Sequence, residues 1–235
     1  MDNLAFDLKT LAFASGDGSH MTRQQRHRGL QLIARELAAL GYRLPQAASL
    51  KPKHIEALVG RWQGGGLSTG TLKNRMAWVR WWAAKVRKTS VLPKNNAEIG
   101  IARRSTWGGN KARTTPGDAL ASLPQPMQLA LRLQMAFGLR LEESLKFRPS
   151  VADQGDTLAL QSSWCKGGRA RQVPVVHPRQ RALLDEVRAL VGNGSLIPEG
   201  QNYIGFRKEI ERATWAAGIR NMHGHRHWYA QWRYQ

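Results

Sequence analysis

Helical hydrophobic periodicity runs through this chain in two blocks, separated by an aperiodic stretch from Lys88 to Pro116. That stretch is rich in glycine, proline, asparagine and threonine, which favour turns and loops over regular structure. A chain of 235 residues with 42% hydrophobic side chains can bury one large core or two small ones. The interruption therefore predicts two domains joined by a basic linker.

The first block predicts three helices, which begin near Thr22, Pro52 and Ser68 or Thr69. Gln25 follows Thr22 by three residues, as in a capping box, and proline is favoured in the first turn of a helix. Apolar residues follow each start at helical spacing. In the third helix they are Leu72, Met76, Val79 and Ala83. Residues 1–20 carry a weaker signal and are predicted to be an N-terminal extension.

The second block mixes helical and alternating patterns. A helix is predicted from about Pro126 to Phe137, where Gly138 interrupts it and another helix begins. Alternation over 158–164 and again over 171–175, with two glycines between, is typical of a β-hairpin. Further helices are expected at 178–191, at 203–217 and from about 223 onward. The predicted fold class is mainly α with a small antiparallel β-sheet (α+β).

The charge of the chain points to a polyanionic partner. Lys and Arg total 36 against 16 Asp and Glu, which gives a net charge of +20 and an isoelectric point near 11.3. Arginine accounts for 25 of these cations, and its planar guanidinium matches phosphate oxygens. The charge is +12 up to residue 110 and +8 beyond it, so one ligand can contact both halves. Nucleic acid is the expected partner, although a generically basic protein that binds phosphates alone has the same charge.

Composition also excludes several classes. No apolar run approaches the 18 residues of a membrane-spanning helix, and the N-terminus lacks the pattern of a secretory signal. The single cysteine, Cys165, cannot form an internal disulfide or a cysteine-based zinc site. The expected compartment is the reducing cytoplasm, with the protein associated with the nucleoid.

Three clusters can carry chemistry: Gly-Leu-Arg-Leu-Glu-Glu at 138–143, Lys-Gly-Gly-Arg at 166–169 and His-Gly-His-Arg-His at 223–227. Each has an ordinary explanation when taken alone. Arg140 and Glu143 form a structural ion pair, Lys166 is a solvated turn lysine, and His-x-x-Arg is common by chance. The alternating histidines have poor geometry for a zinc site, so no metal is expected.

In this order, after a basic helical N-terminal region, the clusters resemble the tyrosine recombinase, or phage integrase, family, in the type carried by mobile genetic elements. The resemblance implies a helical SAM-like core-binding domain at 21–105, a linker at 106–116 and a recombinase catalytic domain at 117–235. It also implies DNA integration or recombination, without a cofactor.

The resemblance implies a role for each cluster residue. Arg140 and Arg226 would hold the scissile phosphate, with Glu143 supporting Arg140. Lys166 would protonate the leaving 5′ oxygen, and His223 would take up the proton of the nucleophile. Two guanidiniums can stabilise the charge of phosphoryl transfer without a metal. A tyrosine would form a covalent 3′-phosphotyrosyl intermediate.

This chain departs from the family pattern at two points. Position 225 is His, where the family usually has Leu. The nucleophilic tyrosine of the family lies well downstream of the second arginine, whereas Tyr229 and Tyr234 share one short predicted helix with Arg226. Both tyrosines are therefore expected to be packing aromatics. The nucleophile is left unknown, the catalytic domain is expected to be C-terminally incomplete, and the chain is expected not to cleave DNA alone.

The expected partner is double-stranded DNA, with homo-oligomers possible on it. Expected phosphate contacts in the third helix and the hairpin are Lys73, Arg75, Arg80, Arg87 and Arg169. The alternative for these residues is a solvated basic face. Trp62 and Trp78 are expected in the core, while Trp81 is left open between packing and base stacking.

Three functions remain after the sequence is read. The first is an integrase or site-specific recombinase. The second is a non-catalytic DNA-binding protein derived from an integrase. The third is an RNA- or ribosome-associated basic protein in which the recombinase clusters are accidental. A preference for single-stranded RNA over duplex DNA would favour the third.

Overall fold

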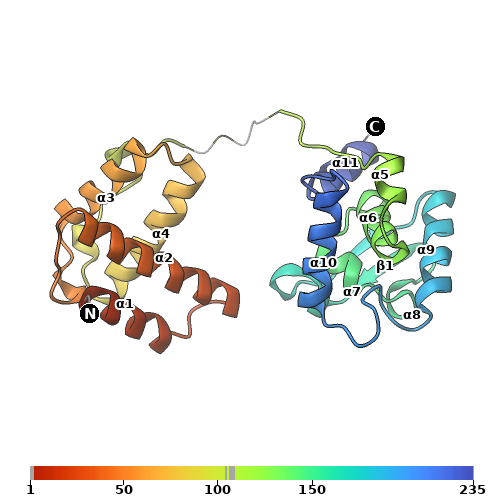
Figure 1. The fold of residues 1–235 in the computed structure, drawn as a ribbon, viewed down its shortest axis with the longest axis horizontal. Coiled ribbons are helices and arrows are strands. Elements are labelled where there is room, and N and C mark those ends of the chain that lie inside the picture. The colour runs from red at the N-terminus through yellow and green to blue at the C-terminus, as the bar shows by residue number, and fades with distance from the viewer. Residues whose placement is uncertain (1–2, 104, 106–108, 235) are drawn as a thin grey trace. The chain divides into compact units, whose positions relative to one another are not determined.

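The computed structural model describes residues 3–103, 105 and 109–234 (Figure 1). The chain forms two compact units, residues 1–107 (unit 1) and 108–235 (unit 2), each with a hydrophobic core of its own. The described residues are mainly helical, with a single two-stranded antiparallel sheet. This confirms the predicted fold class.

Unit 1 is a helical bundle. Its helices are α1 (Asn3–Ala14), α2 (His20–Ala39), α3 (Pro52–Gly64) and α4 (Thr69–Lys85), with short 3-10 turns at Ala47–Ser49, Thr89–Val91 and Ala97–Ile99. Trp62 and Trp82 are fully buried between them, and Ile101 closes the core from the aperiodic segment. The predicted stripe of α4 faces this core.

The N-terminal segment was predicted to be an extension, but in the structure it forms a helix that is part of unit 1. Residues 3–14 form α1, which packs along α2 and buries Leu4, Leu8 and Ala12. The side-chain amide of Gln31 in α2 donates to the carbonyl of Ala5 at 2.9 Å. The apolar spacing of three and four residues was present in the sequence, but it spans only a short segment before the glycine-rich turn.

The predicted helix starts are mostly confirmed. Pro52 begins α3, and Ser68 caps α4, with its Oγ accepting from the backbone N–H of Thr71 at 3.3 Å. Thr22 is not the first residue of α2. Ser19 caps that helix instead and accepts from the Thr22 N–H at 3.3 Å. Both residues can cap a helix, and the earlier one does so because α2 begins at His20.

A glycine brings α2 and α4 of unit 1 close together. A β-carbon on Gly29 would lie 2.2 Å from the ring of Trp78, so only glycine leaves room for the indole. Trp78 therefore packs against the unit 1 core, as expected, although it remains partly exposed. Trp62 lies in the core as predicted.

Unit 2 is built around one central helix, α6. Its elements are α5 (Gly117–Ala121), α6 (Gln125–Phe137), α7 (Leu141–Lys146), α8 (Pro149–Ala152), β1 (Thr157–Leu160), β2 (Arg171–Pro174), α9 (Pro178–Val191), α10 (Tyr203–Ala216) and α11 (Gly224–Arg233). Helix α6 contacts α7, α9 and α11 (Figure 1). Its residues Leu129, Leu133 and Phe137 are fully buried. This packing places the first turn of α11 against the end of α6.

The sheet pairs β1 with β2 in antiparallel register, with Thr157 opposite Pro174 and Leu160 opposite Arg171. The first strand is shorter than predicted, because residues 162–164 form a 3-10 turn rather than a continuation. Trp164 is nevertheless buried, so the alternating pattern correctly indicated its burial although the residue does not belong to a strand. The two glycines after Lys166 both have positive φ, as a tight connection requires.

The end of the predicted linker is attached to unit 2. The N–H of Arg113 donates to the carbonyl of Gly224 at 3.1 Å, and the hydroxyl of Thr115 lies 2.9 Å from His225 Nε2. A β-carbon on Gly224 would lie 2.6 Å from Arg113 Cγ, so the glycine permits this approach. Residues 111–116 therefore pack on the start of α11.

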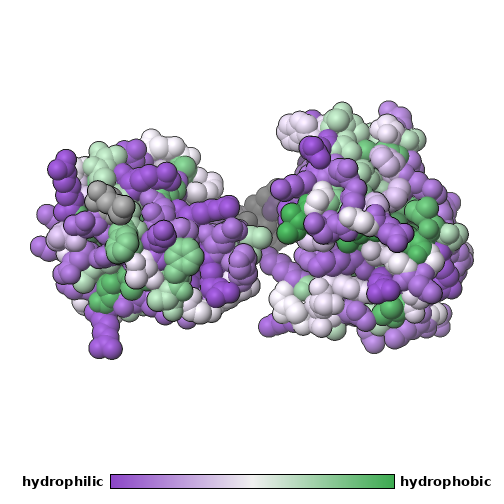
Figure 2. All heavy atoms as spheres, turned by 60° about the horizontal axis from the view of Figure 1, so that its bottom comes forward, coloured by the Kyte–Doolittle hydropathy of each residue, from purple (hydrophilic) through white to green (hydrophobic). Residues whose placement is uncertain are grey.

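Hydrophilic side chains cover most of the visible face of each unit, and hydrophobic side chains form small separate patches (Figure 2). No helix in the described part of the chain is both long and apolar enough to cross a membrane.

Candidate anion site in unit 2

The site is organised around one buried carboxylate, that of Glu143 in α7. Gly138 ends α6 with a φ of +59°, and Arg140 then caps the start of α7. The backbone N–H of Arg140 donates to Glu143 Oε2 at 2.7 Å, and its guanidinium Nη1 donates to Oε1 at 2.7 Å. The Glu143 side chain is 0% exposed. The turn at Gly138 and the contacts with the Glu143 carboxylate thus hold both the backbone and the side chain of Arg140 in place.

A second guanidinium reaches the same carboxylate from β2. Arg171 Nη2 donates to Glu143 Oε2 at 2.7 Å and to the carbonyl of Gly138 at 3.2 Å. Arg171 lies on the second predicted strand, and the sequence pattern does not indicate this contact. Strand alternation could have indicated that Arg171 faces inward, because Arg171 lies on the same face of β2 as the buried Val173.

The third guanidinium comes from the first turn of α11. Arg226 Nη1 donates to the carbonyl of Gly138 and lies 3.7 Å from Glu143 Oε2. Arg140 and Arg226, which the sequence predicts to act together, are thus both placed on one carboxylate. The prediction that Glu143 pairs with Arg140 is also met by the geometry.

Three guanidiniums around one carboxylate leave an excess of positive charge. Burial raises the pKa of the Glu143 carboxyl, but hydrogen bonds from Arg171 and Arg140 outweigh it and leave the pKa below its ordinary value. Burial, with Arg140 and Arg171 nearby, lowers the pKa of Arg226. The repulsion among the guanidiniums falls when an anion binds, so the cluster is suited to hold an oxyanion.

His223 and Lys166 lie within electrostatic range of this cluster. Burial, followed by the nearby cations Arg226, Arg140 and Lys166 and by His227, lowers the pKa of His223 below its ordinary value. The imidazole is therefore mostly neutral near neutral pH and able to accept a proton. Lys166 is exposed in the turn between the strands, beside two glycines with positive φ.

The alternating histidines do not converge as metal ligands would. His225 points inward to Thr115 and is 1% exposed, whereas His223 and His227 are exposed. The rings of His223 and His227 are 5.4 Å apart and nearly perpendicular. Burial lowers the pKa of His225 to about 4, so this histidine is neutral in the folded protein.

The two tyrosines of α11 differ in their surroundings. The ring of Tyr229 lies against Gly138, where a β-carbon would come 2.4 Å from Tyr229 Cδ1. Tyr229 is half-buried against the unit 2 core, and burial raises its pKa. Tyr234 follows the last turn of the helix and is 93% exposed.

The candidate DNA contacts of unit 1 are not equally free. The side chain of Arg75 is 14% exposed, and its Nη1 lies 2.7 Å from Glu36 Oε1, so a carboxylate of the protein already compensates its charge. Arg80 Nη2 donates to Asn96 at 2.6 Å. Lys73 is partly exposed, and Arg87 is exposed at the end of α4.

Two further predicted residues lie on the surface. In unit 2, Arg169 is exposed in the connection between the strands. In unit 1, Trp81, which the sequence left open, packs its ring under Arg26 at 4.5 Å and donates to Asp17 at 3.1 Å.

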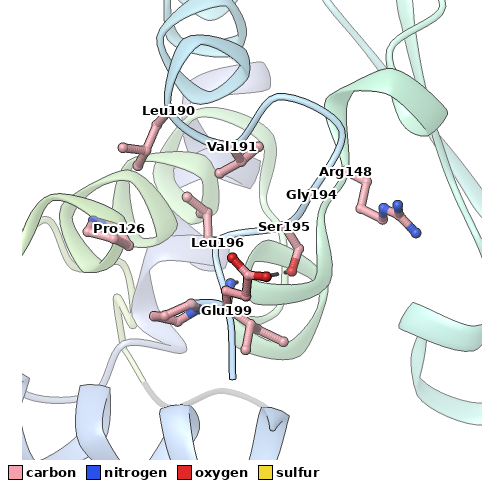
Figure 3. A pocket seen from close by; sticks show the side chains of 10 residues that line it. Pro126, Arg148, Leu190, Val191, Gly194, Ser195, Leu196 and Glu199 are labelled. Carbon is pink, nitrogen blue, oxygen red and sulfur yellow. Dashed lines mark hydrogen bonds between the residues drawn. The ribbon is translucent and has the colours of Figure 1, made fainter. Parts of the chain in front are cut away.

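A cavity of about 640 Å³ lies elsewhere in unit 2 (Figure 3). It is lined by the end of α9 with Leu190 and Val191, by the following loop with Ser195 and Glu199, and by Arg148 before α8. Its walls are mostly apolar and carry both charges. Among its lining residues, Arg148 and Glu199 balance each other in charge, unlike the arginines around Glu143.

The family model "Phage integrase, N-terminal" matches residues 1–90. A search of curated proteins finds no matching relative.

Solved structures resemble the whole chain. Lambda integrase, in a tetramer bound to a Holliday junction, is 17% identical with a TM-score of 0.66, and the match covers 97% of this chain and 71% of that one. The Tn1549 transposon integrase with circular intermediate DNA is 13% identical, with a TM-score of 0.59 and coverage of 97% and 86%. XerH recombinase bound to its difH substrate is 16% identical, with a TM-score of 0.59 and coverage of 98% and 73%.

These structural matches show the fold of the chain. Its fold is that of the tyrosine recombinases. More narrowly, its first 90 residues match the model of the phage integrase N-terminal domain.

Proposed function

We propose that this chain binds duplex DNA as an integrase or site-specific recombinase, and that the cluster around Glu143 holds the scissile phosphate. The observation that carries the proposal is the placement of Arg140 and Arg226 on one buried carboxylate, with His223 and Lys166 within electrostatic range. DNA is the ligand in the lambda integrase and XerH structures, which share the fold. A DNA-bound protein of this kind would lie with the nucleoid in the cytoplasm.

The chemistry follows from these groups. Arg140 and Arg226 bind the non-bridging oxygens of the phosphate and stabilise the charge that develops there. A tyrosine oxygen attacks phosphorus while the bond to the 5′ oxygen breaks. His223 takes the proton from the phenol, and Lys166 gives one to the leaving oxygen. The covalent 3′-phosphotyrosyl link keeps the energy of the phosphodiester, so rejoining to another strand needs no cofactor.

A second function, a DNA-binding protein without cleavage activity, is favoured by the state of the α11 tyrosines. The ring of Tyr229 is packed on Gly138, and it shares a short helix with Arg226. One helix cannot easily direct both the arginine and an in-line nucleophile at the same phosphorus. We therefore propose packing for Tyr229 and no catalytic role for Tyr234.

Binding to duplex DNA is expected to weaken steeply with salt. Each phosphate contact contributes a slope of about −0.9 in log affinity against log salt. The variants Lys73→Gln and Arg87→Gln should each make the slope shallower by about one such contact, measured by fluorescence anisotropy from low to moderate salt. Arg75→Gln, from the same helix, is the matched control and should leave the slope nearly unchanged, because Glu36 already holds that guanidinium. A flat salt dependence, or tighter binding to single-stranded RNA, contradicts the proposal.

Incubation of this chain with a nicked suicide duplex is expected to give no covalent protein–DNA adduct. The duplex traps a cleaved intermediate, so denaturing electrophoresis detects even slow attack. The phenols near Arg226 in the sequence are Tyr229 in α11 and Tyr234 directly after that helix, and neither is expected to reach phosphorus in line. An adduct that persists in Tyr234→Phe but disappears in Tyr229→Phe would reverse the assignment of Tyr229. An adduct with the opposite dependence would make Tyr234 the nucleophile.

A further inference from the structure

A second cavity adjoins the Glu143 cluster on the side of β2 and the later turns of α11. It has a volume of about 380 Å³. Its lining residues are Gly138, Arg171, Gln172, Val173, Pro174, Arg226, Tyr229, Ala230, Arg233 and Tyr234. These include two of the guanidiniums that contact Glu143, but Arg140, Lys166 and His223 are not in the lining that the structure describes. The cavity therefore lies beside the proposed place of the scissile phosphate and shares Arg226 with it.

The charge in this cavity is of one sign. Arg171, Arg226 and Arg233 contribute three guanidiniums from two elements, and the described lining contains no carboxylate. Protein acceptors hold Nη2 of Arg171 and Nη1 of Arg226. Each guanidinium has five N–H donors, so both retain donors for a ligand. Arg171 and Arg226 share the single carboxylate of Glu143, and Arg233 adds a third charge, so the cations of this concave site outnumber the nearby anion and favour an oxyanion.

The aromatic walls give the cavity a second property. Tyr229 is half-buried and packs against Gly138, and Tyr234 lines the cavity while remaining exposed to solvent. The charges of Arg233 and Arg171 lower the pKa of the Tyr229 hydroxyl against the larger, raising effect of burial. The phenol thus stays protonated at neutral pH and is available to donate a hydrogen bond to a bound anion.

We propose that this cavity is a second oxyanion site, which takes a phosphate group in addition to the one expected between Arg140 and Arg226. The phosphate belongs either to the DNA backbone or to a free phosphate compound, because both present the same tetrahedral oxygens. Arg233 and Tyr229 are the residues specific to this site, and Arg226 lies between the two sites. The inference does not require that the chain cleave DNA.

The test uses the full chain labelled with 3-fluorotyrosine and observed by fluorine NMR. The chain has four tyrosines, Tyr42, Tyr203, Tyr229 and Tyr234, so each signal can be assigned with a phenylalanine variant. Sodium phosphate is titrated at constant ionic strength against chloride. The signals of Tyr229 and Tyr234 should shift saturably, while Tyr42 and Tyr203 should respond equally to both salts. Equal responses of all four signals would overturn the proposal.

Variants then locate the phosphate. Arg233→Gln should raise the dissociation constant for phosphate, measured from the Tyr229 signal, by about tenfold, as expected for the loss of one charge-assisted contact. Arg179→Gln, an exposed arginine of α9, is the matched control and should change it less than twofold. Arg140→Gln should also leave it unchanged. If Arg140→Gln abolishes the shift and Arg233→Gln does not, phosphate binds only at the Glu143 cluster and the proposal fails.

A short duplex in place of phosphate identifies the source. The same shifts with duplex indicate a backbone phosphate, whereas shifts with inorganic phosphate alone indicate a free phosphate compound. If the natural chain does not bind the duplex but inorganic phosphate still shifts the Tyr229 signal, the proposed recombinase function is contradicted and the proposed phosphate site is supported. The two proposals can therefore fail separately.

Discussion

Replacing Glu143 with alanine is expected to lower the free energy of unfolding of unit 2 by about 3–5 kcal/mol, as for other buried ion pairs that lose one partner. The carboxylate is 0% exposed and accepts from Arg140 and Arg171, with Arg226 nearby. Its removal leaves partly buried guanidiniums facing one another without a counter-ion. The loss should therefore exceed that of any single exposed ion pair in the unit.

Hydrogen exchange of the full chain, followed by mass spectrometry, can measure this effect, because peptides from α6 and α7 report on unit 2 while α2 and α4 serve as an internal reference. Glu142→Ala is the matched control from the neighbouring position. Its carboxylate is 40% exposed and pairs with Lys146 at 2.6 Å, so its removal should cost about 0.5 kcal/mol. A loss below about 1 kcal/mol for Glu143→Ala would mean that the three arginines do not depend on it.

The stability of unit 2 is expected to fall as the pH is lowered from about 6.5 to about 4, because of His225. Burial lowers the pKa of this histidine to about 4, whereas an unfolded histidine titrates near 6.5. Between these two pKa values His225 is protonated in the unfolded chain but neutral in the folded protein, so acid favours unfolding. The contribution is complete above the unfolded pKa and disappears through this window. At about 1.4 kcal/mol per pKa unit, the full change is on the order of 3 kcal/mol.

The variant His225→Leu separates this histidine from the other acid-sensitive groups. Leucine fills a similar buried space and cannot ionise, so the variant should lose less stability between pH 7 and pH 4.5 than the natural chain. Urea unfolding of both proteins at several pH values, followed by a signal from unit 2, gives the difference between their free energies of unfolding. Parallel curves for the two proteins would show that His225 is not the group responsible.

The helices were largely predictable because their signals are local. Pro52 begins α3, residues 178–191 form α9, and Gly138 ends α6, all as their sequence patterns indicate. The errors are also local in origin. Helix α1 exposes Phe6 and Phe13 as well as burying Leu4 and Leu8, so its apolar residues do not form one clear stripe. Trp164 alternates with its neighbours because it is buried, without belonging to a strand.

The candidate site was only partly predictable, because part of it depends on pairing between distant segments. Arg140 and Glu143 are one helical turn apart, so their contact can be read from spacing. The contact of Arg171 with Glu143 depends on how the hairpin folds against α7, which no local pattern specifies. The same applies to Arg75, whose partner Glu36 lies two helices earlier. Whether the cluster residues carry catalysis stays a proposal.

The carbonyl of Gly138 accepts from both Arg171 and Arg226, so the end of α6, the strand β2 and the first turn of α11 meet at one backbone atom. These three segments are brought together only by the tertiary structure of unit 2, and a fragment that lacked any of them would not keep the arrangement. Any affinity of these arginines for an anion would therefore be thermodynamically linked to the folding of this unit. A ligand that recognises only the assembled arginines raises the population of the folded state by mass action.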